Sequence, residues 1–147
     1  MVQVVWFKRD LRVEDHAALT AACAGDRAVL PLYIFEPDLW RQPEMAGRHF
    51  AFLIESLTSL DAALRARGPA LTVETGDAVE VFARLHRTHA ISEIHAHEET
   101  GLLWTYARDR RVRAWARRTG VPVQEYRQHG VWRASKGRDG WATRWDR

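Results

Sequence analysis

The sequence predicts an α/β protein in which a central layer of parallel strands is covered by helices on both faces. Five short strand-like stretches, the first two of them mainly apolar runs, alternate along the chain with segments whose apolar residues recur at three- and four-residue steps. Runs of this kind suit strands buried on both faces, and strand–helix–strand units form right-handed crossovers in a parallel sheet. At 147 residues, the chain is long enough to bury the core of one domain. We therefore expect a Rossmann-like three-layer sandwich with a five-stranded parallel sheet.

Two buried strands and a helix make up the first third of the chain. Val2–Phe7 and Ala28–Phe35 are apolar along most of their length, as expected for strands. Pro31 lacks the N–H that a sheet ladder needs, which predicts a bulge or an edge position there. Between the strands, Glu14–Ala24 predicts a helix that ends at Gly25.

The longest predicted helix is Ala46–Arg67, which follows a loop at Glu36–Met45 and ends before Gly68 and Pro69. One apolar stripe defines it and is expected to face the core. The stripe consists of Phe50, Leu53, Ile54, Leu57, Leu60 and Leu64.

The second half of the chain continues the alternation. Further strands are expected at Ala70–Glu74, Ile91–His97 and Val121–Tyr126, and helices at Asp77–His89 and Leu102–Thr119. In the last helix we expect an apolar face that also contains Arg111, so Arg111 needs a carboxylate partner. The residues of that face are Leu103, Trp104, Ala107, Ala114 and Trp115.

Composition excludes several classes of protein. No apolar run approaches the roughly 20 residues that span a bilayer, and the first residues lack the pattern of a signal peptide. The single cysteine, Cys23, excludes a disulfide framework and a thiolate metal cluster. We therefore expect a cytoplasmic protein without a membrane partner.

The positive charge is concentrated at the end of the chain. Residues 126–147 hold six basic and two acidic residues, so the preceding 125 residues carry −1 of the total of +3. This distribution weakens the case for a nucleic-acid clamp in the folded body. The end segment also holds Trp132, Trp141 and Trp145, which predicts a connector that packs against another domain.

Ligands of open parallel sheets bind beyond the carboxyl ends of the strands. The loops at that edge are Lys8–Arg12, Glu36–Arg48, Glu74–Asp77 and Glu98–Trp104. The first loop places four charges within five residues, which fits either a polar binding site or a solvated turn.

Other chemistry is less well supported by the sequence. His95 and His97 share one strand face, but a metal site needs further ligands, and His86 and His89 lie on the preceding helix. We expect structural histidines and no metal site. The chain has no G-x-G-x-x-G, Walker A or G-x-S-x-G motif. The turn between the first strand and the first helix contains no glycine, which argues against an ordinary dinucleotide site.

Several motifs resemble the photolyase/cryptochrome family. Residues 4–19 (VVWFKRDLRVEDHAAL) are similar to the family's opening signature, in which many relatives have arginine at the position of Lys8. Three further segments resemble the family, in family order and spacing across residues 2–126: Val29–Pro37, Arg48–Leu60 and Ala107–Asp109.

The resemblance implies the amino-terminal domain of a blue-light flavoprotein. Residues 1–126 would form this domain, and 127–147 a connector to a helical FAD-binding domain that lies outside this chain. In a family photolyase, photoreduced FAD donates an electron to a pyrimidine dimer in DNA. The parent protein is thus expected to be a DNA photolyase, a carbon–carbon lyase that contacts DNA, while this chain alone has no catalytic residues and no repair activity.

The resemblance also implies a light-harvesting antenna in this domain, either a deazaflavin, a lumazine, a flavin or a folate. Glu98 and Glu99 could accept hydrogen bonds from its ring, and Phe35 or Trp104 could stack on it. Trp104 and Thr105 stand where folate-binding relatives have Asn and Glu, which argues against folate, and Trp104 could fill the pocket. Helix capping or packing is the alternative role for each candidate. The candidates are Arg9, Asp10, Leu11, Phe35, Glu36, Arg48, Glu98, Glu99 and Trp104.

Three alternatives stay open at this point. The chain could belong to a cryptochrome-type photoreceptor without repair activity. It could also be a free-standing nucleotide-binding module of the universal-stress or electron-transfer-flavoprotein type. Finally, it could be a purely structural interaction domain.

Overall fold

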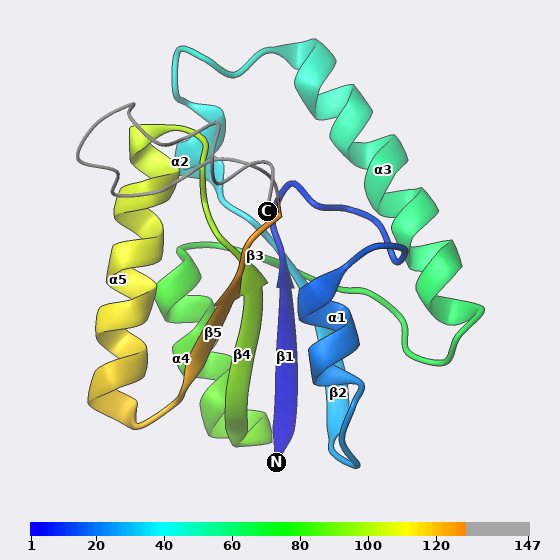
Figure 1. Cartoon of the computed structure of the whole chain (residues 1–147). Helices are drawn as coiled ribbons and strands as arrows, with labels where there is room; N and C mark the ends of the chain where they lie inside the picture. The colour runs from blue at the N-terminus through cyan, green and yellow to red at the C-terminus, as the bar shows by residue number, and fades with distance from the viewer. Residues whose placement is uncertain (129–147) are drawn as a thin grey trace, which may run out of the picture.

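A computed structural model describes residues 1–128 and arranges them in three layers, with a parallel sheet between two layers of helices (Figure 1). The strands are β1 (Val2–Phe7), β2 (Ala28–Phe35), β3 (Thr72–Thr75), β4 (Ile91–His97) and β5 (Val123–Tyr126). The helices are α1 (Ala17–Ala22), α2 (Pro37–Trp40), α3 (Gly47–Arg65), α4 (Ala78–His89) and α5 (Leu103–Thr119). The expected five-stranded α/β sandwich is confirmed. The expected connector lies almost entirely outside the described residues, as do Trp132, Trp141 and Trp145.

The strand order is β3-β2-β1-β4-β5, and every neighbouring pair is parallel. β1 is central because its sequence, apolar apart from Gln3, tolerates burial on both faces. The chain moves outward from β1 in one direction through β2 and β3, and in the other through β4 and β5. The loops after β1, β2 and β4 therefore diverge around one point at the carboxyl edge of the sheet, where ligands bind in such folds.

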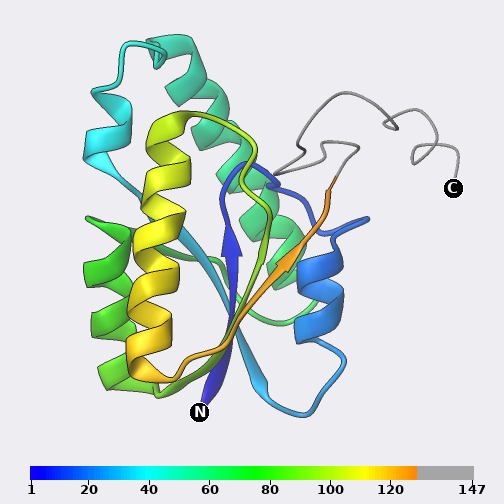
Figure 2. The same cartoon turned by 60° about the vertical axis from the view of Figure 1, so that its left-hand side comes forward.

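Each face of the sheet has its own apolar core. α4 and α5 cover one face, where Val4, Trp6, Leu32 and Phe82 are buried. α1 and α3 cover the other face, as the rotated view makes clear (Figure 2). Alternation along β1 therefore sends its side chains to two different layers.

Pro31 is accommodated where β2 has only one neighbour. It pairs in register with Val5 of β1, whereas β3 pairs with β2 only from Leu32 onward. At Pro31, β2 is therefore locally an edge strand, and no ladder hydrogen bond to β3 is lost. Of the two arrangements expected there, a bulge or an edge position, the structure has the edge position.

The first two helices differ from the sequence expectation in where they occur. α1 begins at Ala17 and not at Glu14, because Asp15 has a positive φ of 47° and the His16 side chain caps the helix by accepting from Leu19 N–H. The expected loop at Glu36–Met45 contains the short helix α2, which has proline in its first turn.

The predicted stripe of α3 is only partly buried. Leu53, Leu60 and Leu64 face the core, but Phe50 and Ile54 are 41% and 46% exposed. Figure 1 shows the cause, because the first half of α3 rises above the carboxyl ends of the strands and no longer faces the sheet.

The largest error concerns the buried face of α5. The expected face is correct at Trp115 but wrong in its first half, since Leu103 is 89% exposed and Ala107 also faces solvent. The inward face instead consists of Thr105, Arg108, Asp109, Val112, Trp115 and Ala116. Arg108 and Asp109 are buried in that face. Hydrophobic periodicity places charged residues on the solvent side, so it could not identify this face. Among residues 1–128, no helix has both the length and the apolar character that crossing a membrane requires.

Phe82 tests the core on the α4–α5 face. It is fully buried and packs edge-on against Trp6 and stacked against Trp115. Phe82→Ala should lower the free energy of unfolding by about 3–5 kcal/mol in urea titrations, because it leaves a cavity. Leu103→Ala, at the exposed position, should change it by less than about 0.5 kcal/mol; equal losses would contradict this packing.

Candidate functional site

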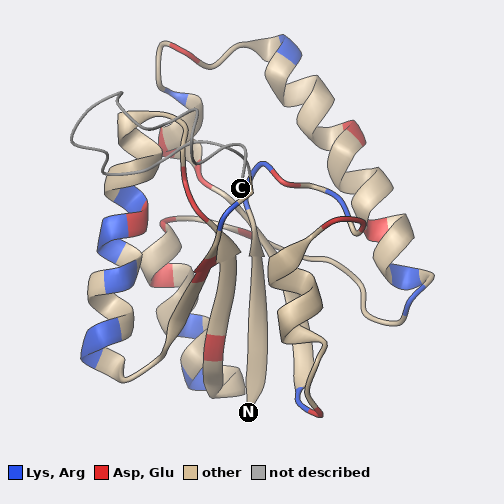
Figure 3. Ribbon diagram, in the orientation of Figure 1, with Lys and Arg blue, Asp and Glu red and all other residues tan. Residues whose placement is uncertain are grey.

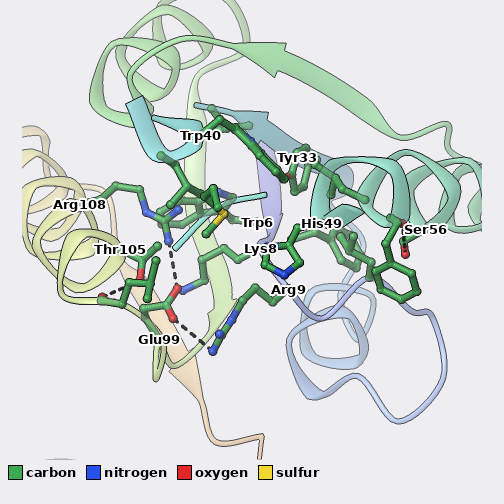
Figure 4. A pocket seen from close by; sticks show the side chains of 18 of the residues that line it. Trp6, Lys8, Arg9, Tyr33, Trp40, His49, Ser56, Glu99, Thr105 and Arg108 are labelled. Carbon is green, nitrogen blue, oxygen red and sulfur yellow. Dashed lines mark hydrogen bonds and ion pairs between the residues drawn. The ribbon is translucent and has the colours of Figure 1, made fainter. Parts of the chain in front are cut away.

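A cleft of about 610 Å³ opens at the carboxyl edge of the sheet, where the loops after β1, β2 and β4 diverge (Figure 4). Its floor comes from the ends of β1 and β2, one wall from α2 and α3, and the other from the β4–α5 loop and the start of α5. The lining residues include an aromatic group and a charged group, with aliphatic side chains between them. They are Trp6, Phe7, Lys8, Arg9, Leu11, Arg12, Tyr33, Ile34, Leu39, Trp40, Met45, His49, Phe52, Leu53, Ser56, Glu99, Leu102, Thr105 and Arg108.

The aromatic wall is fixed by ring contacts behind it. Trp40 stacks on Phe35 with centroids 5.8 Å apart, and Phe50 meets both rings edge-on. These contacts join the end of β2, α2 and the start of α3, which holds the Trp40 ring at the cleft. The Trp40 Nε1 donor is buried and has no hydrogen-bond partner among the described residues. Such a donor fits a site whose ligand supplies an acceptor.

The charged wall is centred on Arg108, whose side chain is only 5% exposed. Its guanidinium donates to Glu36 at 2.7 Å, to Glu99 at 3.2 Å and to Asp109 at 2.9 Å. Burial disfavours the charged form, but these carboxylates outweigh it and raise the pKa of Arg108. One buried cation therefore joins the end of β2, the β4–α5 loop and α5.

Lys8 extends this network to the loop after β1. Its Nζ donates to the second oxygen of Asp109 at 2.8 Å. Lys8 Nζ and the Arg108 guanidinium also lie 4.9 Å and 4.8 Å from the centre of the Trp6 ring. These cation–π contacts anchor both cations to the last part of β1.

Burial changes the acid–base behaviour of two groups beside the cleft. Burial raises the pKa of Glu36 despite the opposing charge of Arg108. Burial, with the charge of Glu36, raises the pKa of Tyr33 to about 12. The Tyr33 phenol therefore stays protonated at neutral pH and can donate a hydrogen bond into the cleft.

Glu99 links the buried network to the cleft mouth. Its Oε1 accepts from Gly101 N–H at 2.6 Å and lies 3.5 Å from Arg9 Nη2, on a side chain that is 63% exposed. A Cβ at Gly101 would lie 2.7 Å from this oxygen and 2.9 Å from Arg9. A side chain at position 101 would therefore have to displace the Arg9 guanidinium or the Glu99 carboxylate from their present contact.

A second buried cluster lies under the first loop, outside the cleft lining. Asp10 Oδ1 accepts from Lys8 N–H at 2.9 Å, and Oδ2 lies 2.5 Å from His97 Nδ1 and 2.9 Å from His16 Nε2. Burial opposes ionisation, but the hydrogen bonds from His16, His97 and Lys8 outweigh it and hold the pKa of Asp10 well below its ordinary value.

The three side chains of this cluster have ligand atoms within 4.8 Å of one another, which is compatible in distance with a metal ion. The hydrogen bonds indicate a structural role instead. His16 Nδ1 accepts from Leu19 N–H, so Nε2 carries the proton and faces Asp10 Oδ2 at 2.9 Å. A metal-ligating histidine normally donates from its second nitrogen, and His16 does the opposite.

The predicted site residues separate into three groups. Arg9, Leu11 and Glu99 line the cleft. Asp10, Glu36 and Phe35 lie behind its wall, where they hold lining residues in position. The remaining three do not line the cleft: Arg48 is exposed in the first turn of α3, Glu98 donates its N–H to the Tyr126 carbonyl, and Trp104 is half-buried beside Arg108.

The expectation that Trp104 fills the pocket is therefore wrong, because α5 turns Thr105 and Arg108 toward the cleft. Sequence reasoning missed Trp6, Lys8, Tyr33, Trp40 and Arg108 as members of the site. Arg108 had a detectable signal in the Ala107–Asp109 motif. Trp40 lies in the Glu36–Arg48 loop expected at this edge, but it was not singled out, because its position depends on a helix that was expected to be a loop.

Two other expectations concern charged or titratable side chains. Arg111 is paired, as predicted, with Asp77 at 2.7 Å, but it is 52% exposed, so the expectation that it is buried is wrong. His95 lies 2.9 Å from the Tyr126 hydroxyl, and burial lowers its pKa despite the opposing charge of Glu93. His86 packs edge-on against Trp115.

The cleft has the chemistry of a binding site. Ser56 donates to the Phe52 carbonyl at 2.8 Å, and His49, the histidine that lines the cleft, lies two helical turns away on α3. This serine is therefore not activated by that histidine. Flat aromatic walls, protonated Tyr33 and fixed charges at one side suit a planar molecule with a polar edge.

Comparison with known proteins finds photolyases and cryptochromes both by family profile and by individual sequence. A profile of the family described as DNA photolyase matches residues 3–140. The chain is 41% identical over 96 residues to the deoxyribodipyrimidine photo-lyase of Salmonella typhimurium, covering 62% of this chain and 20% of that protein. It is 32% identical over 105 residues to cryptochrome DASH of Solanum lycopersicum, covering 67% of this chain and 18% of that one.

A solved archaeal photolyase from Sulfolobus tokodaii, described as containing two FAD molecules, superposes with a TM-score of 0.77 at 31% identity. The superposition covers 86% of this chain and 29% of that one. The chain thus spans about a fifth of the length of the curated relatives it matches.

Arg108 can be tested against a neighbour on the same helix. Arg108→Met removes the cation that three buried carboxylates share and should lower the free energy of unfolding by about 3–5 kcal/mol. Arg110→Met changes an exposed arginine and should stay within about 0.5 kcal/mol of the parent chain in the same urea titration. Similar decreases in the free energy of unfolding for both variants would argue against the buried network.

Asp10 predicts a dependence of stability on pH. A carboxyl whose pKa is lowered on folding stabilises the fold above its ordinary pKa of about 3.9, and this contribution is lost as the pH falls toward the folded value. Asp10→Asn should therefore cost about 3 kcal/mol at pH 7, and the difference from the parent should narrow between about pH 5 and pH 2. Urea titrations across this range measure it, with exposed Asp38→Asn as the control at pH 7. A difference that stays constant with pH would count against ionised Asp10.

Proposed function

The chain belongs to the DNA photolyase family, and we propose from this that it is the antenna-binding domain of a light-driven DNA-repair flavoprotein, a deoxyribodipyrimidine photolyase. The observation that carries the proposal is the cleft of about 610 Å³ at the carboxyl edge of the sheet, with aromatic rings on one wall and fixed charges on the other. An antenna bound there would absorb near-ultraviolet or blue light and pass the excitation to FAD in the neighbouring domain.

A flavin-type ring, either a flavin or a deazaflavin, fits the described residues best. Trp40 offers an aromatic face and a buried donor without a partner, and Tyr33 offers a protonated hydroxyl. Lys8 and Arg9 supply positive charge at the opposite side. The Sulfolobus tokodaii relative, whose description includes a second FAD as an implied light-harvesting cofactor, supports the same class of ligand.

Folate is disfavoured by the start of α5. Thr105 and Trp104 stand at the positions where folate-binding relatives have Glu and Asn. The Thr105 hydroxyl donates to the Leu102 carbonyl at 2.8 Å, so its proton is already used within the first turn of its own helix. Neither side chain supplies the carboxylate that those relatives use.

The partner in this proposal is a carboxyl-terminal FAD-binding domain of the same cytoplasmic protein, through which the parent also contacts DNA. The coding sequence after codon 147 tests the partnership, and we expect a helical FAD-binding sequence there. A stop codon at that point would favour the free-standing nucleotide-binding module. A cryptochrome-type photoreceptor is the second candidate, because relatives of both kinds match the chain. Blue-light repair of a pyrimidine dimer by the longer protein would separate the two.

Binding of a flavin to the full chain tests the cleft directly. Ser56 lines the cleft, so Ser56→Trp should fill part of it and weaken binding of riboflavin, FMN or FAD by about tenfold or more, equivalent to about 1.4 kcal/mol. Quenching of flavin fluorescence measures the affinity, and circular dichroism checks the fold.

Ser59→Trp is the matched control, because Ser59 lies on the same helix but is exposed and does not line the cleft. It should leave the affinity unchanged. Equal binding by both variants, or no binding of any of the three flavins by the parent chain, would contradict a flavin site in this cleft.

A further inference from the structure

The outer face of α5 carries a row of arginines without acidic neighbours on the same helix. Figure 3 shows the basic side of this helix. Asp109 is the one acidic residue of α5, and it is buried. The row, called here the α5 arginine face, consists of Arg110, Arg111, Arg113, Arg117 and Arg118.

Helix stability does not account for this row. Arg110 and Arg113 are three residues apart, and Arg113 and Arg117 are four apart, which are the spacings at which like charges destabilise a helix. Arg117 and Arg118 lie in the last turn, where the helix dipole favours cations. That effect does not reach Arg110, Arg111 or Arg113.

Ion pairing accounts for only part of the row. Arg111 is paired with Asp77 at 2.7 Å, and Arg113 with Glu125 at 3.0 Å. Within residues 1–128, the guanidinium groups of Arg110, Arg117 and Arg118 form no ion pair or hydrogen bond, and all three side chains are exposed. The face therefore presents unneutralised positive charge although residues 1–125 together carry −1.

The shape of this face is also specific. Ala107 and Ala114 leave a shallow depression of about 380 Å³, bordered by Arg110, Arg111 and Arg117. Arg110 and Arg117 are seven residues apart on one side of the helix, or about 10.5 Å along its axis. The two guanidinium groups can therefore contact separate groups of an extended anion.

We propose that the α5 arginine face binds the phosphate backbone of double-stranded DNA, independently of base sequence. This goes beyond the proposed function, in which DNA reaches the parent through the FAD-binding domain. Phosphate backbones are recognised by clustered arginines. A protein partner is less well matched, because protein interfaces centre on buried apolar or aromatic residues, and residues 110–118 expose only arginine and alanine around the depression.

The test measures binding of the full 147-residue chain to an undamaged 20-base-pair duplex by fluorescence anisotropy between 50 and 200 mM salt, concentrations typical of such titrations. In the variant Arg110→Glu/Arg117→Glu, affinity at the lowest salt should fall about tenfold or more. The slope of log K against log salt should decrease by about 1.8, the value for two phosphate contacts. The variant Arg110→Gln/Arg117→Gln removes the two positive charges without adding negative ones, and it should show the same decrease in slope.

The control is Arg27→Glu/Arg67→Glu, which alters the net charge equally at exposed positions away from α5. This control variant should retain most of the affinity for the duplex and the same slope of log K against log salt as the parent chain. Three outcomes would overturn the proposal: no binding by the parent chain, unchanged binding after reversal at Arg110 and Arg117, or equal losses in the control. The last two would assign binding to the end of the chain or to net charge alone. None of these outcomes bears on flavin binding in the cleft.

Discussion

The buried ion-pair network around Arg108 is the interaction on which the cleft depends. Arg108 bonds to carboxylates from the end of β2, from the β4–α5 loop and from its own helix, and Lys8 adds the loop after β1 through Asp109. These segments are far apart in sequence, and the loops after β1 and β4 are also joined by other polar contacts, including those of Arg9 with Glu99 and of Asp10 with His97. A buried charge left without its partner is costly, so the loops are fixed in one arrangement. The cleft walls are consequently formed before any ligand binds, which reduces the ordering that binding requires.

This arrangement explains why several charged residues at the edge of the sheet act indirectly. Asp10 organises His16, His97 and the first loop, and Glu36 holds Arg108. Neither lines the cleft, but both position residues that do. The aromatic contacts of Phe35 serve the same purpose for Trp40. These supporting contacts hold the cleft walls in an arrangement that can bind and orient a ligand, as the proposed antenna role requires.

α5 combines two different uses of arginine. Its inward face uses Arg108 to bind the loops together, and its outward face carries arginines that are exposed. The acidic residues that bring the body close to neutrality include buried Glu36, Glu99 and Asp109, which already pair with buried cations. The net charge of the body therefore hides a local excess of positive charge on one surface.

The sequence by itself determined the fold class and the position of most strands, because Val2–Phe7 and Ala28–Phe35 are mainly apolar and Ile91–His97 follows in the same alternation of strand and helix. It also identified Arg9, Leu11 and Glu99, since the ends of parallel strands meet at one edge. Only the tertiary structure decided the inward face of α5, the helix that carries Trp40, and the division between lining and supporting residues. Local sequence patterns reflect only the hydrophobicity of each side chain, that is, its preference for the core over water. A buried Arg108 or Asp109 is stable only when partners from distant segments arrive together, and no local pattern contains that information.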